Sequence, residues 1–179
     1  MLLTCNTIVQ SFMLLITMPL GGITGGTQTV LGYNYGAGRP DRIRRAEKHI
    51  VVLGLVFTAV MFIIAQVGPG YFVRIFTRES SYVGITEWAI RIYTLCVIPL
   101  AVQYTVVDGF TGMGIAKVAV SLSMFRKFVY FMGMLFLPML FGVEKVFFAE
   151  PISDMVACVL SSCTYLLLSG RVLGDNRRL

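Results

Sequence analysis

The chain has 179 residues, of which 56% are hydrophobic and 13% are charged, and its mean hydropathy is +0.79. Soluble domains carry roughly 25% charged residues, so this composition excludes a water-soluble globular domain and favours lipid as the surroundings of the chain. The net charge of +6 suits an anionic partner, but in a membrane protein an excess of Lys and Arg more often marks cytoplasmic loops. No basic face interleaved with aromatic residues accompanies the charge, so no nucleic-acid partner is expected.

Five stretches are apolar enough to span a bilayer as helices, which takes about 20 residues each. We predict helices near residues 2–31, 50–67, 82–107, 118–140 and 146–168. The predicted fold class is therefore all-α: a polytopic integral membrane helical bundle, forming a single partial transmembrane domain over residues 1–179. The first helix starts at once, with no basic leader, and this start suggests that upstream helices are missing.

The connection after the first helix has the sequence GYNYGAGRPDRIRRAEK at residues 32–48. Its glycine spacing fits neither a P-loop nor a dinucleotide-binding turn. We interpret Gly32, Gly36 and Gly38 as a loop that is either a flexible turn or a hinge beneath a moving bundle. The cations that follow predict a cytoplasmic loop at residues 39–48. Lys117 and the C-terminal arginines fall on the same side, which places the C-terminus in the cytoplasm as well.

Charged residues inside the predicted spans are the main candidates for function, because charges within a bilayer are costly and normally face a bundle interior. Arg126 lies about 13 Å into its helix. Glu150 and Asp154 are four residues apart and share a helical face. A hairpin centred near residue 143 leaves an axial offset of about 9 Å between Asp154 and Arg126, so a direct pair needs a register shift at Pro151. Asp154 and Glu150 are candidates for binding a coupling proton or cation; a structural ion pair or an interfacial acid is the alternative.

Polar residues within apolar runs are candidates for a substrate cavity. Gln10, Gln103 and Tyr104 are of this kind, and Met13 would suit an adaptable apolar wall. Bonds between helices, or packing against lipid, are the alternative for each of them.

Four prolines fall within the predicted spans. They are Pro19, Pro99, Pro138 and Pro151. Helix breaks at membrane depth are typical of transporters, where freed carbonyls line a cavity, although simple kinking is the alternative at each position.

Other chemistries lack the residues they need. The four Cys lie in apolar runs without a CxxC pair, and His49 is the single histidine, so no metal site is predicted. No nucleophile with an adjacent base is visible, and we therefore do not expect an enzyme.

Three stretches resemble one transporter family. GYNYGAGRPDRIRRAEKH at residues 32–49 resembles the turn after a glycine-rich helix in the multidrug and toxic compound extrusion (MATE) transporters. FTGMGIAKVAVSLSMFRKFVYFMGMLFLPMLFG at 110–142 and VEKVFFAEPISDMVA at 143–157 are similar to later segments of the same family. The resemblance is nearest to the MepA-like branch, and by position Arg126 and Asp154 match the family's Arg and the Asp of its P-I-S-D segment.

The resemblance implies a fold of about twelve helices in two lobes, of which this chain would form the last five. It implies the C-terminal portion of a multidrug efflux antiporter in the plasma membrane, which exchanges Na⁺ or H⁺ for cationic amphiphilic drugs by alternating access and needs no other cofactor. The implied partners are membrane lipid, those drugs and a complementing N-terminal half. Two alternatives stay open: a flippase of the same superfamily that moves a lipid-linked saccharide, and a truncated or split membrane fragment that does not transport.

Overall fold

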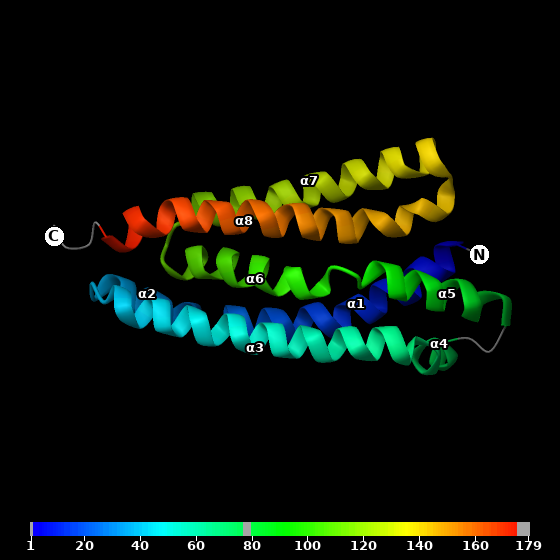
Figure 1. Cartoon of the computed structure of the whole chain (residues 1–179), viewed down its shortest axis with the longest axis horizontal. Coiled ribbons are helices and arrows are strands. Elements are labelled where there is room, and N and C mark those ends of the chain that lie inside the picture. The colour runs from blue at the N-terminus through cyan, green and yellow to red at the C-terminus, as the bar shows by residue number, and fades with distance from the viewer. Residues whose placement is uncertain (1, 77–79, 175–179) are drawn as a thin grey trace.

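The computed structural model describes residues 2–76 and 80–174, and all the secondary structure of these residues is helical. The long helices run side by side along one axis, so the molecule is an elongated bundle (Figure 1). The elements in chain order are α1 (Leu2–Gly25), α2 (Gln28–Gly36), α3 (Pro40–Val67), α4 (Pro69–Phe76), α5 (Ser80–Tyr93), α6 (Val97–Gly112), α7 (Ala116–Phe141), the 3-10 helix η1 (Val143–Phe148) and α8 (Ala149–Gly174).

The described residues contain four helical units that are long and apolar enough to cross a membrane. They are Thr4–Gly36, Pro40–Val67, Ala116–Phe141 and Val143–Gly170. A fifth span arises if α5 and α6 count together, because Tyr82–Tyr93 and Val97–Gly112 pass the same test as a pair bent by 48°. The prediction of an all-α polytopic bundle with about five spans is therefore confirmed.

The prediction of one continuous helix at residues 82–107 was wrong, because the helix breaks between α5 and α6. The break frees backbone carbonyls that need partners within a membrane. The carbonyl of Arg91 accepts a hydrogen bond of 3.0 Å from the amide of Gln66 on α3 and one of 3.3 Å from the hydroxyl of Thr94. Side chains thus satisfy part of the backbone that the bend exposes.

The predicted loop at residues 39–48 was also wrong, because α3 begins at Pro40. Proline suits the first turn of a helix, where its missing N–H would have had no helical partner and its fixed φ is already helical. The cations from Arg42 to Lys48 are therefore carried on the first turns of a long helix. Only Ala37, Gly38 and Arg39 separate α2 from α3, and at Gly38 φ is +63°, a conformation that glycine adopts without steric cost.

Gly32 and Gly36, which we predicted in a loop, both lie within α2. A Cβ atom on Gly32 would lie 2.7 Å from the carbonyl oxygen of Gly112, and one on Gly112 would lie 2.8 Å from the carbonyl oxygen of Gln28. The backbones of α2 and α6 therefore touch at this crossing, and only glycine permits it. A Cβ atom on Gly36 would meet nothing within 4 Å. Whether these residues act as a hinge stays a prediction.

We had considered that the four prolines break helices at membrane depth, but not all of them lie in the interior of a helix. Pro99 is the third residue of α6, and Pro151 is the third residue of α8. Both lie within the first turn, where a backbone N–H has no helical acceptor to lose. Pro19 lies inside α1, and Pro138 lies in the last turn of α7.

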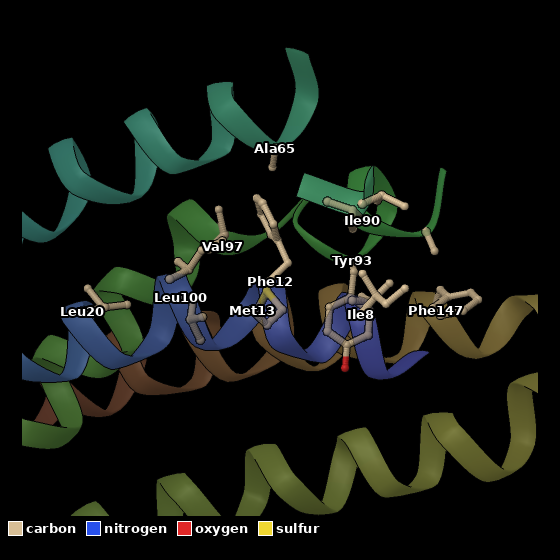
Figure 2. Close-up of a cluster of buried hydrophobic side chains, with 14 of the residues drawn as sticks. Ile8, Phe12, Met13, Leu20, Ala65, Ile90, Tyr93, Val97, Leu100 and Phe147 are labelled. Carbon is tan, nitrogen blue, oxygen red and sulfur yellow. The ribbon is translucent and has the colours of Figure 1, made fainter. Parts of the chain in front are cut away.

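The apolar core consists of two clusters that follow each other along the bundle. The first lies around α1, α4 and α5, where Phe12 packs edge-on against Phe72 with ring centroids 5.0 Å apart. Figure 2 shows this cluster, with Leu20 on α1 and Leu100 on α6 at one end. The second cluster gathers Leu31 of α2 and side chains from the first half of α3, the end of α6 and the start of α7.

Candidate functional site

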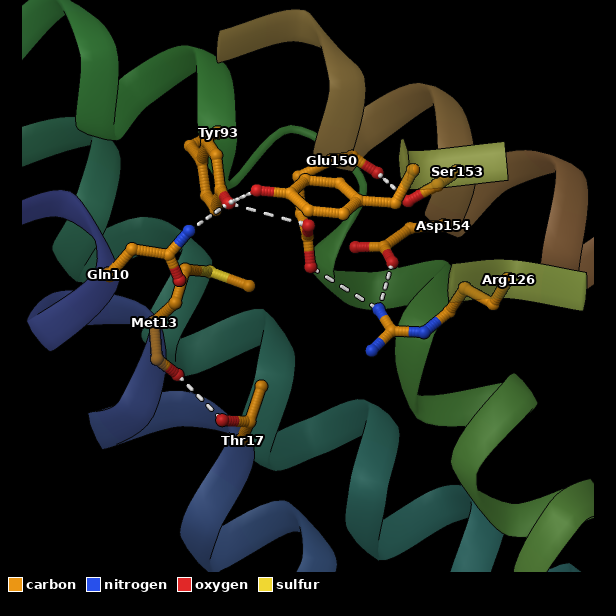
Figure 3. A network of polar contacts seen from close by, with 9 residues as sticks. Gln10, Met13, Thr17, Tyr93, Arg126, Glu150, Ser153 and Asp154 are labelled. Atoms are coloured by element: carbon orange, nitrogen blue, oxygen red, sulfur yellow. Dashed lines mark hydrogen bonds and ion pairs between the residues drawn. The ribbon is translucent and has the colours of Figure 1, made fainter. Parts of the chain in front are cut away.

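Arg126, Glu150 and Asp154 form one buried charge cluster between α7 and α8. Nη1 of Arg126 donates a hydrogen bond of 2.6 Å to Oδ1 of Asp154 and one of 3.3 Å to Oε1 of Glu150. The side chain of Arg126 is 9% exposed, that of Asp154 is 1% exposed and that of Glu150 is 12% exposed. Figure 3 shows the guanidinium of Arg126 reaching both carboxylates. Among the described residues these are the only two ion pairs. One of them is the direct contact between Arg126 and Asp154 that the sequence left open.

The predicted offset between Arg126 and Asp154 was wrong because of how the hairpin turns. The chain reverses at Gly142, where φ is +96°, and continues in η1, which rises about 2.0 Å per residue instead of about 1.5 Å. From Gly142 the chain covers about 24 Å back to Arg126 and about 21 Å forward to Asp154. The remaining difference is within reach of an Arg side chain, and no shift at Pro151 is needed.

Local sequence explains why these side chains point inward. The buried residues of α7 are Ala119, Leu122 and Arg126, a spacing of three and four that forms one stripe along the helix. Glu150 and Asp154 lie in the first two turns of α8 at a spacing of four, and therefore on one face. The two stripes meet, so the only cation in the stripe on α7 faces two acids on α8.

The charge cluster contains more acid than base. With both acids ionised, one guanidinium opposes two carboxylates, which leaves one net negative charge. Oδ2 of Asp154 is buried and has no hydrogen-bond partner among the described residues. Uncompensated charge and unpaired polar atoms are both costly in a buried setting. The cluster is therefore balanced when it also holds a proton or stands next to one further cation.

A polar network extends from the charge cluster toward α1. The hydroxyl of Tyr93 donates to Oε2 of Glu150 at 3.4 Å and lies 3.4 Å from the hydroxyl of Tyr130. The amide of Gln10 donates to the hydroxyl of Tyr93 at 2.5 Å (Figure 3). Glu150 is thus tied to helices α1, α5 and α7 at once.

Sequence reasoning missed both tyrosines of this network. A tyrosine in an apolar run reads as a core aromatic, and nothing near Tyr93 in the chain marks its partners. Tyr130 did carry a signal, because it follows Arg126 by four residues and so shares its helical face. Gln10, which we considered for a substrate cavity, belongs to this network instead.

A cavity of about 270 Å³ adjoins the charge cluster. Its lining includes Gln103 and Tyr104 of α6, two of the predicted cavity residues, together with Arg126, Lys127 and Asp108. Cζ of Arg126 lies 6.0 Å from the centroid of the Tyr104 ring, within range of a cation–π contact. Oε1 of Gln103 is buried without a partner among the described residues.

The remaining predicted cavity residue, Met13, lies elsewhere. It is 4% exposed and packs in the first apolar cluster, so it does not line the cavity beside Arg126. On the cavity wall, Asp108 accepts a hydrogen bond from the hydroxyl of Thr24 and one of 2.9 Å from the amide of Gln28. This acid is therefore held in place by α1 and α2.

The sequence comparison identifies a family. The family model MatE matches residues 3–136, which is most of the chain. No curated protein matches.

Solved structures match the fold over nearly the whole chain. The MATE transporter VcmN of Vibrio cholerae in its bent form has a TM-score of 0.83 at 17% identity, and the match covers 97% of this chain and 39% of that one. A multidrug resistance MATE family transporter in an inward-facing conformation has a TM-score of 0.85 at 17% identity, over 94% of this chain and 40% of that one. A further MATE structure in a bent conformation has a TM-score of 0.88 at 16% identity, over 97% and 39%.

The chain thus spans about two fifths of the length of the solved structures it matches. No comparison bears on the MepA-like branch, which stays a prediction. The family match and the membrane-spanning fold agree with the resemblance seen in the sequence, and together they show that this multi-pass membrane chain belongs to the MatE family of transporters.

Proposed function

We propose that the chain forms the C-terminal portion of a cation-coupled multidrug efflux antiporter, which exchanges Na⁺ or H⁺ for cationic amphiphilic drugs. The observation that carries the proposal is the surplus negative charge of the charge cluster, buried beside a cavity that shares Arg126 with it. A site with one surplus negative charge at membrane depth favours a bound cation electrostatically, whether that cation is a proton, Na⁺ or a charged drug.

Exchange follows from this charge count. One monovalent cation at a time balances the one surplus negative charge. A coupling ion and a cationic drug in the adjacent cavity therefore compete to balance it. Each occupant then favours the conformation in which its own charge is best balanced, and this differential affinity shifts the population between states. Tyr104 offers an aromatic face and Gln103 an unpaired amide oxygen to a drug with a planar cationic ring.

The arrangement of the ends supports one orientation of the chain in the cell membrane, where we propose that it lies. The turn between α2 and α3, the turn before α7 and the end of α8 lie at one end of the bundle (Figure 1). The cations on α3 from Arg42 to Lys48 and Lys117 on α7 lie at this end, which we assign to the cytoplasm. Arg177 and Arg178 lie outside the described residues. Because the matched structures are longer, we also propose that transport requires a complementing N-terminal half.

A binding experiment on the chain in detergent tests the proposal. Ethidium serves as the cationic probe, and its fluorescence is titrated at several pH values and Na⁺ concentrations. Wild type should bind ethidium in competition with Na⁺ or H⁺. Glu150→Gln keeps the 2.6 Å contact between Arg126 and Asp154 but removes the surplus charge, so binding should weaken at least tenfold and lose its cation dependence.

Glu144→Gln is the matched control, since it makes the same charge change at an exposed residue of η1. Equal ethidium affinity and equal cation competition in wild type and Glu150→Gln would contradict the proposal. Cells that express the chain with an N-terminal half should extrude ethidium. Translocation of a lipid-linked saccharide without ethidium efflux would instead establish a flippase, and neither activity would establish a non-transporting fragment.

A further inference from the structure

Helix α6 separates two openings of different character. Gln103, Tyr104 and Asp108 face the polar cavity beside Arg126. Val102 and Val106 lie on the opposite side of the helix, because successive residues turn by about 100°. They form the floor of a second cleft, of about 380 Å³. The two openings therefore lie on opposite sides of α6.

The walls of the second cleft come from α3 and α8. Both helices pack on α6, which lies between them in Figure 1. Val51 of α3 and Leu166 of α8 line the cleft with the valines of the floor, so most of its length is apolar. Its surface suits a hydrocarbon chain, and it is not suited to a polar solute.

One end of this cleft is basic. Arg44 and Lys48 lie four residues apart on α3, are exposed, and form no ion pair with any residue in the described ranges. Glu47 also lines the cleft, but its carboxylate is turned inward: the residue is 6% exposed, and its Oε2 accepts a hydrogen bond of 2.5 Å from the hydroxyl of Tyr165. Its Oε1 lies 3.1 Å from where a Cβ atom on Gly109 would stand, so it fills the space beside α6. The two cations therefore remain available to an anion at the mouth.

The basic end lies at headgroup depth. α3 has 28 residues, or about 42 Å of helix, which matches a bilayer of about 40–45 Å including its headgroups. Arg44 and Lys48 fall within the first nine residues of α3, whereas Val51 lies about one turn deeper. Long cationic side chains keep their charge at the interface while their stems lie along apolar surface.

We propose that this cleft is a binding site for one anionic phospholipid. The phosphate is held by Arg44 and Lys48 at the membrane surface, and an acyl chain lies on the floor of Val102 and Val106. The proposal rests on the charge at one end of the cleft and its apolar length, and it does not depend on which substrate the chain transports.

Lipid binding to the purified full chain in detergent tests this site. We expect dioleoyl phosphatidylglycerol to remain bound in native mass spectrometry as one molecule per chain, and to raise the melting temperature more than dioleoyl phosphatidylcholine does. Glycerol 1-phosphate, the headgroup without acyl chains, should do neither. The double variant Arg44→Gln/Lys48→Gln should weaken phosphatidylglycerol binding at least tenfold.

Arg42→Gln/Arg45→Gln is the matched control, because it removes the same charge from exposed positions of the same helix that do not line the cleft. A second variant, Val102→Phe, fills the floor and should also weaken binding. Equal binding of the two lipids, equal loss in the control, binding of glycerol 1-phosphate alone, or full binding by Val102→Phe would each overturn the proposal.

Discussion

Nη1 of Arg126 lies 2.6 Å from Oδ1 of Asp154, although the two residues are 28 positions apart and belong to different helices. The contact joins α7 to α8 within the membrane-spanning region, and both side chains are buried. α7 buries few of its other side chains, so this contact is a principal polar link between it and the bundle.

Replacing Arg126 should be severe. Arg126→Gln leaves two buried carboxylates without their cation, and loss of one partner of a buried pair costs about 3–5 kcal/mol. We expect a matching loss of stability in detergent, followed by fluorescence of the single Trp88, which packs edge-on against Phe147. Lys127→Gln removes the same charge from an exposed position and should change stability by less than about 0.5 kcal/mol. Similar stability of the two variants would show that Arg126 is not the structural partner of the acids.

The hydroxyl of Tyr93 should couple α1 to the charge cluster. Tyr93→Phe leaves the amide of Gln10 without its acceptor and Oε2 of Glu150 without its donor, and we expect a loss of about 1–3 kcal/mol. A double-mutant cycle with Gln10→Met should give a coupling energy of at least about 0.5 kcal/mol. Tyr71→Phe, at an exposed tyrosine, is the control for loss of a hydroxyl. Strict additivity of the Tyr93 and Gln10 changes would argue against this bond.

The crossing of α2 and α6 should tolerate no side chain at Gly112. Gly112→Ala places a methyl group 2.8 Å from the carbonyl oxygen of Gln28, so the helices must separate and the chain should lose about 1–3 kcal/mol. Gly36→Ala lies in the same helix as Gln28 and meets nothing within 4 Å. It should be neutral or gain up to about 1 kcal/mol, because alanine favours a helix over glycine. Thermal unfolding in detergent measures both, and the opposite order would refute the close crossing.

The buried amide of Gln103 should serve binding more than stability. Its Oε1 has no partner among the described residues, so Gln103→Leu should leave stability unchanged or raise it. Under the proposed function, ethidium binding should weaken at least tenfold, because the cavity loses its amide acceptor. Thr105→Val, on the opposite side of α6, is the control and should bind ethidium as wild type does. Wild-type affinity in Gln103→Leu would remove this residue from the binding site.

The orientation of the chain is open to direct labelling. In a variant whose four cysteines are replaced, Glu144→Cys and Ala37→Cys each place one exposed thiol at opposite ends of the bundle. Since cations collect near Ala37, we expect a membrane-impermeant maleimide to label Glu144→Cys in intact cells. Ala37→Cys should react only after permeabilisation. The reverse pattern would invert the proposed orientation.

Hydropathy alone predicted the spans, because a bilayer requires long apolar helices and little else produces them. The start of α3 was missed since a basic run such as Arg42 to Lys48 fits a helix end at the interface as well as a loop. The break after Tyr93 has no glycine at its centre, and its stabilising partner Gln66 comes from another helix.

Part of the charge cluster was also predictable from the properties of the bilayer. The cost of charge in lipid identified Arg126 and Asp154 as inward-facing, which needs no knowledge of their neighbours. Their contact depended on the 3-10 geometry of η1, and the sequence carries no strong signal for that geometry. The network through Tyr93 depended on which helices are adjacent, and that follows from tertiary packing alone.

The two apolar clusters have a mechanical consequence. Leu20 and Leu100 belong to one cluster and Leu31 and Phe110 to the other, while the bend after Tyr93 lets α5 and α6 follow different axes. Each half of the molecule thus carries its own cohesive interior. A change in packing at one membrane surface therefore need not disturb the packing at the other surface, because the two clusters share no buried residue.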